Sequence, residues 1–237
     1  MAANQKKKKG TQTAWNYRTM FGPGLSFAAA EAYKLLRTNI MFSFPDEGMC
    51  HILGVTSSVQ DEGKSSTTCN LAYALSEAGK KVLLLEADLR RPTIGSKLNV
   101  RRVPGVTNLL VSREDFHSMV QQCSHAPNMD ILTAGDIPPN PSELLGSQRM
   151  SALLEELAQE YEYIVVDLPP VTAVSDALAV SPLLQGVLVV TKEGTSQKKG
   201  LEEAMRQLKQ AEVRILGFVY RTEGDSAQKK YQGRYGK

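Results

Sequence analysis

The spacing of hydrophobic and polar positions changes along the chain. Apolar residues recur at helical spacing from Ala28 to Phe42, and Pro45 ends this predicted helix. Beyond it, short apolar runs alternate with helical stretches, a pattern typical of a parallel sheet covered on both faces. The pattern therefore predicts a doubly wound, mostly parallel α/β fold. The predicted strands are Ile52–Val55, Val82–Leu85, Asp130–Leu132, Ile164–Val166, Gly186–Val190 and Ile215–Val219, and the later helices lie near 64–78, 106–110, 113–123, 142–160, 174–181 and 197–210.

Polar segments flank the region of alternating strands and helices. Residues 1–25 carry a basic run from Lys6 to Lys9, and we expect a flexible N-terminal tail in which Phe21 is one candidate anchor. Residues 221–237 are polar and glycine-containing, and we expect a second flexible tail there. The sequence thus predicts one domain, residues 26–220, between two tails.

Composition narrows the class of protein. Hydrophobic residues make up 42% and charged residues 22% of the 237 positions, as in ordinary globular proteins. A net charge of +3 is too small to indicate a nucleic-acid partner. No apolar run approaches the ~20 residues of a membrane span, and the three scattered cysteines indicate reduced thiols. We therefore expect a cytoplasmic protein.

The first predicted strand runs into a phosphate-binding loop. Residues 56–68 read Thr-Ser-Ser-Val-Gln-Asp-Glu-Gly-Lys-Ser-Ser-Thr-Thr, and a helix follows from about Lys64. This is a P-loop in which Ser58 replaces the usual first glycine. Backbone N–H groups cradle the phosphates, the lysine reaches the β- and γ-phosphates, and the following serine can ligate Mg²⁺. The predicted ATP-binding residues are Ser58, Asp61, Glu62, Gly63, Lys64, Ser65 and Ser66.

Acidic residues follow two other predicted strands. Glu86 and Asp88 come after the second strand, and Asp167 follows a later one. Ligands of open α/β sheets bind beyond the carboxyl ends of strands, so these acids should face the phosphates. Arg90 either stabilises phosphate charge or pairs with a neighbouring acid. The predicted catalytic residues are Lys64, Asp88, Glu86 and Arg90, with Asp88 orienting the attacking oxygen, and the predicted Mg²⁺ ligands are Ser65, Asp88 and Asp167.

These segments together resemble a known family, the bacterial tyrosine kinases (BY-kinases) of capsular and exopolysaccharide biosynthesis, in their stand-alone cytoplasmic form. Besides the P-loop, residues 84–92 and 165–171 are similar to the family's second and third Walker-like motifs. Residues 135–145, Gly-Asp-Ile-Pro-Pro-Asn-Pro-Ser-Glu-Leu-Leu, are also typical of the group. The resemblance spans residues 26–220 and implies a P-loop NTPase fold with a Rossmann-like, three-layer arrangement.

The resemblance implies an activity and partners. Using ATP and Mg²⁺, the family phosphorylates tyrosines of its own C-terminal tail, here Tyr231 and Tyr235. A membrane adaptor supplies an activating cytoplasmic segment and recruits the kinase to the inner face of the membrane. Ring-like self-association, a cognate tyrosine phosphatase and control of polysaccharide export are also implied. Glu31, Lys34 and Arg37, three residues apart on a helix, resemble the self-association motif and should form one charged stripe.

Several positions depart from the family pattern. Glu86 and Asp61 stand where aspartate and glycine are usual, and Lys34 replaces an arginine. Tyr220-Arg221 replaces a Leu-Asn pair at the expected base-binding strand end, and the tail has few tyrosines. Two alternatives stay open: a switch ATPase of the partitioning kind, although residues 57–60 lack that group's extra lysine, and a nucleotide-bound scaffold of the polysaccharide machinery.

Overall fold

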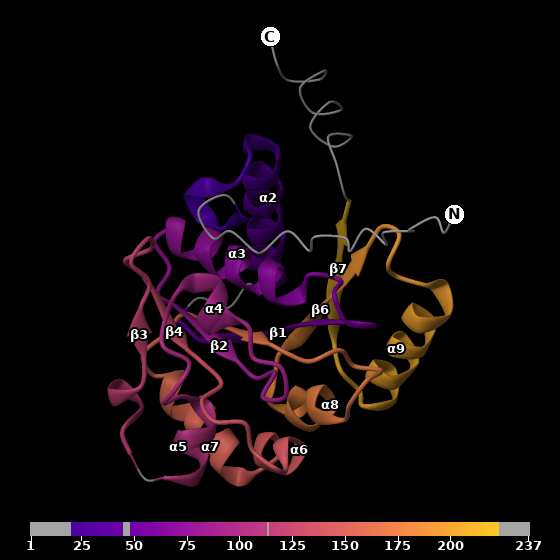
Figure 1. Ribbon diagram of the computed structural model, residues 1–237. Helices are drawn as coiled ribbons and strands as arrows, with labels where there is room; N and C mark the ends of the chain where they lie inside the picture. The colour runs from indigo at the N-terminus through magenta and orange to yellow at the C-terminus, as the bar shows by residue number, and fades with distance from the viewer. Residues whose placement is uncertain (1–19, 45–47, 113, 223–237) are drawn as a thin grey trace, which may run out of the picture.

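A seven-stranded sheet forms the centre of this computed structural model, which describes residues 20–44, 48–112 and 114–222 (Figure 1). The strand order is β3-β4-β2-β5-β1-β6-β7. All neighbouring pairs run parallel except β3 and β4 at one edge. The strands are β1 (His51–Ser57), β2 (Val82–Glu86), β3 (Gln121–Gln122), β4 (Met129–Leu132), β5 (Tyr163–Asp167), β6 (Gly186–Lys192) and β7 (Ile215–Arg221).

The central strands are apolar on both faces, which confirms the predicted doubly wound architecture. Every residue of β2 and β5 is buried, as expected where helices cover both faces of a parallel sheet. All six predicted strands are present. The pattern missed β3 because its two glutamines carry no hydrophobic signal and pair at an antiparallel edge.

Helices form the two outer layers. In Figure 1, α2, α3 and α4 lie above the sheet and α5 to α8 lie below it, while α9 flanks β6 and β7. Ile40 and Leu71 belong to the core cluster of the upper layer, whereas Leu154 and Leu208 belong to that of the lower layer. The helices are α2 (Phe27–Ser43), α3 (Lys64–Glu77), α4 (Ile94–Leu98), α5 (Val106–Val111), α6 (Pro141–Leu145), α7 (Gln148–Leu157), α8 (Asp176–Val180) and α9 (Lys198–Gln210), with 3-10 turns η1 (Gly22–Gly24), η2 (Phe116–Ser118) and η3 (Ser181–Leu183).

Two predicted helices differ from the observed elements. The helix near 113–123 is wrong, because Asp115 caps only the short turn η2 before the chain enters β3. The helix near 142–160 is divided into α6 and α7 at Gly146, and the Ser147 hydroxyl accepts the Met150 N–H to begin α7. Short polar caps therefore interrupt stretches whose apolar spacing alone suggests continuous helices.

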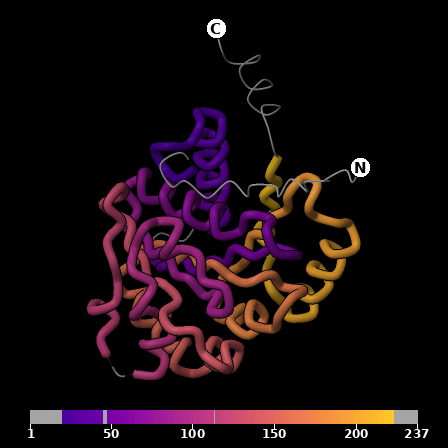
Figure 2. The backbone as a smooth tube through the Cα atoms, in the orientation of Figure 1, coloured from indigo at the N-terminus to yellow at the C-terminus, as the bar shows by residue number. Residues whose placement is uncertain are grey.

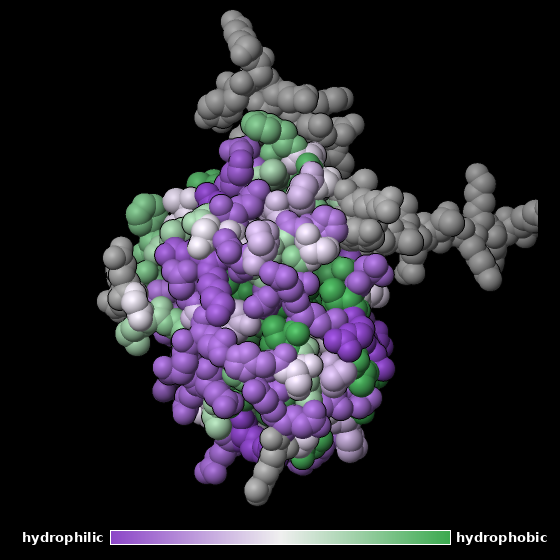
Figure 3. All heavy atoms as spheres, turned by 90° about the vertical axis from the view of Figure 1, so that its left-hand side faces the viewer, coloured by the Kyte–Doolittle hydropathy of each residue, from purple (hydrophilic) through white to green (hydrophobic). Residues whose placement is uncertain are grey.

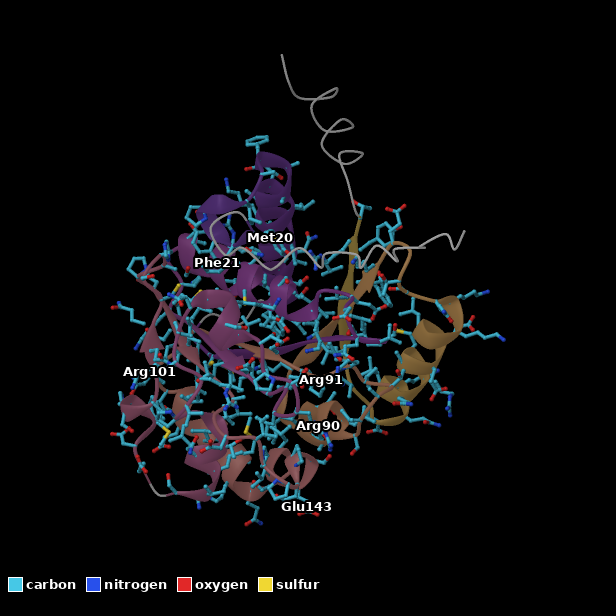
Figure 4. All side chains as sticks on the ribbon, in the orientation of Figure 1. Met20, Phe21, Arg90, Arg91, Arg101 and Glu143 are labelled. Atoms are coloured by element: carbon cyan, nitrogen blue, oxygen red, sulfur yellow. The ribbon has the colours of Figure 1, made fainter. Side chains whose placement is uncertain are left out.

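The folded unit extends N-terminal to the predicted boundary at residue 26. Phe21 is only 3% exposed and its ring lies 5.4 Å from that of Tyr73 on α3 (Figure 4). Asn70 holds the same segment, accepting the Gly22 N–H at 3.0 Å and donating to the Met20 carbonyl at 3.1 Å. The expected anchoring role of Phe21 is thus observed, and the path of this segment beside α3 can be followed in Figure 2.

The surface is mostly polar on the side of the sheet edge formed by β3. Figure 3 shows a predominantly hydrophilic face with small hydrophobic patches between hydrophilic residues. None of the helices in the described part of the chain combines the length and the apolar character that a membrane crossing requires.

Candidate active site

The P-loop connects β1 to α3 through two residues with left-handed backbone. Asp61 has φ 65° and Gly63 has φ 89°, and Gly63 immediately precedes the first turn of α3. A Cβ at Gly63 would lie 1.5 Å from Nη1 of Arg221, so a side chain there would displace this guanidinium. That guanidinium, at the end of β7, donates to the Gly63 carbonyl at 3.3 Å. The left-handed backbone therefore favours glycine at this position, and the Arg221 guanidinium occupies the space that a side chain would need.

A buried carboxylate holds the loop in shape. Glu62 is 0% exposed and accepts hydrogen bonds from the Ser58 hydroxyl at 2.9 Å and from the Val59 N–H at 2.8 Å. The hydroxyl of Ser196, before α9, also donates to Glu62. The side chains of Ser58 and Glu62 therefore stabilise the loop. A pocket beside the loop, which we call the phosphate hollow, is lined by Asp61, Gly63 and residues 64–66. Ser58 and Glu62 do not line it.

Lys64 lies among the predicted acids. Its Nζ is 2.7 Å from Oδ2 of Asp88, 3.8 Å from Oδ1 of Asp167 and 3.4 Å from the Ser65 hydroxyl. Burial disfavours the charged ammonium, but Asp167 and Asp88 outweigh this effect and raise the pKa of Lys64. The carboxyl ends of β1, β2 and β5 thus bring Lys64, Ser65 and the two aspartates close together, as the sequence predicts.

Asp167 supplies an oxygen that suits a metal ion. The residue is 0% exposed, and its Oδ1 accepts the Thr68 hydroxyl at 3.2 Å. Its Oδ2 is buried and has no hydrogen-bond partner among the described residues. Burial raises the pKa of Asp167, although the Lys64 ammonium opposes the shift. Carboxylate and hydroxyl oxygens are the ligands Mg²⁺ prefers, so Asp167, Asp88 and Ser65 fit that ion.

Glu86 departs from its expected catalytic position. One oxygen accepts the backbone N–H groups of Thr93 at 2.5 Å and Ile94 at 2.7 Å, and the other accepts that of Ala134 at 3.1 Å. Burial raises the pKa of Glu86 to about 7 even though these N–H groups oppose the shift. The carboxylate therefore serves as a hydrogen-bond acceptor for the backbone at the start of α4 and just after β4.

Arg90 pairs with an acid, which favours the structural one of its two expected roles. Arg90 is labelled in Figure 4. Its Nε and Nη2 donate to the carboxylate of Asp176 at 2.8 and 3.0 Å. Asp176, on α8, is fully buried and also accepts the Ser142 hydroxyl. The neighbouring Arg91, in contrast, is exposed and lines the phosphate hollow.

The three charged residues of the expected self-association stripe lie on α2 and have different partners. Lys34 and Glu31 form a surface ion pair at 2.8 Å on α2. Arg37 is half-buried, and its Nη1 donates to the Ala74 carbonyl near the end of α3 at 3.0 Å. The guanidinium thereby donates to a carbonyl of the last turn of α3, where the helix itself supplies no N–H donor.

Sequence reasoning missed part of the hollow. Thr93, at the start of α4, and Lys97, within it, line the hollow together with Asp88 and Arg91. No motif contains Thr93 or Lys97, and α4 is too short to give a periodic signal. The predicted phosphate acceptors, Tyr231 and Tyr235, lie outside the described residues.

The phosphate loop and the parallel sheet define a P-loop NTPase, and comparison with known proteins agrees. Residues 48–230 match the ParA family profile, described as NUBPL iron-transfer P-loop NTPase, and the chain belongs to this family. It is 34% identical over 231 residues to tyrosine-protein kinase YwqD of Bacillus subtilis (strain 168), a match that covers 98% of this chain and 95% of that protein.

Solved structures narrow the class further. The kinase domain of the Escherichia coli tyrosine kinase ETK has a TM-score of 0.77 at 34% identity, covering 82% of this chain and 75% of that one. The chimerical protein CapA2B2 has a TM-score of 0.76 at 30% identity, covering 81% and 83% of the two chains. Within the ParA-type NTPases, the chain belongs to the bacterial protein-tyrosine kinases, as the sequence resemblance implies.

Proposed function

We propose that this kinase transfers the γ-phosphate of ATP to Tyr231 and Tyr235 of its own C-terminal tail. The observation that carries the proposal is the convergence of Lys64, Asp88 and Asp167 at the phosphate loop, in a chain related to tyrosine kinases. A tyrosine hydroxyl oxygen forms a bond to the γ-phosphorus, the bond from that phosphorus to the β–γ bridging oxygen breaks, and ADP leaves. The hydroxyl proton passes to Asp88.

Each residue of the site has a part in this transfer. Lys64, held 2.7 Å from Asp88, is drawn to the arriving β- and γ-phosphates, which frees the carboxylate of Asp88 to orient the tyrosine hydroxyl. Ser65, Asp88 and the unpartnered oxygen of Asp167 would hold Mg²⁺. When bound, this ion neutralises charge on the phosphates. The buried setting of the site strengthens these electrostatic interactions.

The proposed partners follow from the family and from one surface of the structure. We propose that a membrane adaptor provides an activating cytoplasmic segment and brings the kinase to the inner face of the membrane. A ring of copies then presents each tail to a neighbouring site, and a tyrosine phosphatase reverses the reaction. Exposed apolar side chains on α2, Phe27 at 75% and Phe42 at 81% exposure, support docking through this helix. The output is control of capsular or exopolysaccharide synthesis and export.

Tandem mass spectrometry after incubation with Mg-ATP tests the proposal. We expect phosphate on Tyr231 or Tyr235 in the wild type and none in Lys64→Met, whose P-loop lacks the ammonium. The double variant Tyr231→Phe/Tyr235→Phe should lose phosphotyrosine while it still binds ATP. The measurement is repeated with the adaptor's cytoplasmic segment added. An unmodified tail under both conditions would contradict the kinase proposal and favour a nucleotide-bound scaffold.

A further inference from the structure

The phosphate hollow has a second wall opposite the P-loop. One wall consists of loop residues and the first turn of α3, whereas the other comes from the loop after β2 and from α4. This second wall contains Arg91, Thr93 and Lys97, and Lys64 belongs to the first wall. We call residues 91–97 the phosphate arm. The three side chains of the arm that line the hollow offer two cations and a hydroxyl, the groups that bind phosphate oxygens elsewhere.

Thr93 carries a hydroxyl that the fold itself does not use. Its Oγ1 is buried and has no hydrogen-bond partner among the described residues. Thr93 occupies the position before α4 where a threonine side chain commonly caps the helix, yet it makes no capping hydrogen bond. A buried hydroxyl without a partner is unfavourable, and a phosphate oxygen in the hollow would give it one.

Lys97 brings positive charge into the same hollow. Burial lowers the pKa of Lys97, and Arg221 and Lys64 add to this effect, although Cys69 and Asp167 oppose it. Lys97 and Lys64 line the hollow from α4 and from the start of α3, and Arg221 lies next to it, against the Gly63 carbonyl. An anion with several negative oxygens would be attracted by all of them at once.

Glu86 connects the phosphate arm to the sheet. Its carboxylate accepts the N–H groups of Thr93 and Ile94 at the start of α4, and that of Ala134 just after β4. Glu86 is itself fixed at the end of the central strand β2. The carboxylate thus sets where the Thr93 backbone, and with it the Thr93 hydroxyl, lies relative to the P-loop.

We propose that the phosphate arm is a second phosphate-binding element of this site, in which the Thr93 hydroxyl and the Lys97 ammonium contact nucleotide phosphates and Glu86 is the positioning residue. The inference rests on the proposed use of a nucleotide by this site. Under this proposal, Glu86 increases the affinity for nucleotide indirectly, by positioning the phosphate arm. Thr93 and Lys97, which belong to no motif, contact the phosphates directly.

Titration of Mg-ADP and Mg-ATP into the full chain tests the arm without requiring kinase activity. Thr93→Val keeps the shape and removes the hydroxyl, and Lys97→Met keeps the length and removes the charge. We expect each Kd to rise about tenfold, as for a lost hydrogen bond to a charged group, and the Lys97→Met effect to shrink with added salt. Thr38→Val on α2 and Lys209→Met on α9 are matched controls and should bind as wild type. Wild-type affinity in Thr93→Val and Lys97→Met would overturn the proposal.

A double-variant cycle tests the positioning role of Glu86. If Glu86 acts through the arm, Glu86→Ala should weaken nucleotide binding, and adding Thr93→Val should raise Kd little further. Glu86→Gln, which keeps one acceptor oxygen at the same reach, should bind better than Glu86→Ala. Fully multiplicative effects of Glu86→Ala and Thr93→Val on Kd would refute the coupling. Melting temperatures measured in parallel identify any variant that is unfolded. Loss of phosphotyrosine with these binding effects intact would contradict the kinase proposal alone.

Discussion

The two side chains of the Arg90–Asp176 ion pair differ in burial. This difference predicts which of the two residues costs more stability when it is replaced. The Asp176 side chain is 0% exposed, whereas that of Arg90 is 44% exposed. Arg90→Ala leaves a buried carboxylate with only the Ser142 hydroxyl as a side-chain donor. Asp176→Ala instead leaves an arginine that water can reach. We therefore expect Arg90→Ala to destabilise the fold more than Asp176→Ala does.

The magnitudes follow from burial. Removing one partner of a fully buried pair costs about 3–5 kcal/mol. Because water reaches Arg90, we reduce the expected cost of Arg90→Ala to about 2 kcal/mol, and that of Asp176→Ala to about 1 kcal/mol. The double variant should also lose about 1 kcal/mol, since no unpaired buried charge remains. Adding Asp176→Ala to Arg90→Ala should thus restore stability.

Urea unfolding at equilibrium, checked for unchanged m-values, measures these differences. Melting temperatures should fall by about 4–8 °C for Arg90→Ala and about 2–4 °C for the other two variants. A double variant less stable than Arg90→Ala would refute the argument from the unpaired carboxylate. Phosphoryl transfer measured well below these melting temperatures separates the two roles of Arg90. Activity lost in Arg90→Ala but retained in Asp176→Ala would show that the guanidinium acts on the phosphates.

Two further predictions concern the packing around α3. Phe21→Ala should destabilise the protein by about 3 kcal/mol, because a nearly enclosed ring leaves a cavity against Tyr73, while Met20→Ala, at a position 41% exposed, should change the melting temperature little. Gly63→Ala should weaken Mg-ATP binding measured by calorimetry, because alanine is strained at a φ of 89° and its Cβ would displace the Arg221 guanidinium. Adding Arg221→Ala should restore binding only in part, since the backbone strain remains, and full recovery would contradict that reasoning.

The central sheet could be predicted from the sequence because its strands are buried on both sides. Runs such as Val82–Leu85 consist of apolar residues alone and leave few alternatives to a buried parallel strand. The edge strand β3 and the short helix α4 could not, because they depend on contacts with distant parts of the chain. Neither Gln121–Gln122 nor Ile94–Leu98 carries a periodicity long enough to indicate its structure.

The sequence predicted where the site residues lie in the fold better than it predicted their hydrogen-bond partners. Strand ends and the P-loop pattern place Lys64, Asp88 and Asp167 together, and the structure confirms this. The hydrogen bond of Arg37 to the Ala74 carbonyl and the pairing of Arg90 depend on tertiary neighbours that no local pattern reveals. A residue's place in a motif gives its location in the fold, while its hydrogen-bond partners come from elements far away in the sequence.

Hydrogen-bond saturation separates the buried carboxylates near this site into two kinds. Glu62, Glu86 and Asp176 are all fully buried and each accepts hydrogen bonds at both oxygens. Asp167 is equally buried, yet one of its oxygens has no partner among the described residues. An unsatisfied buried carboxylate oxygen is unfavourable in the fold alone, and a cation can compensate it. The saturated acids therefore shape the loops, whereas the unpartnered oxygen of Asp167 supports its proposed role as a Mg²⁺ ligand.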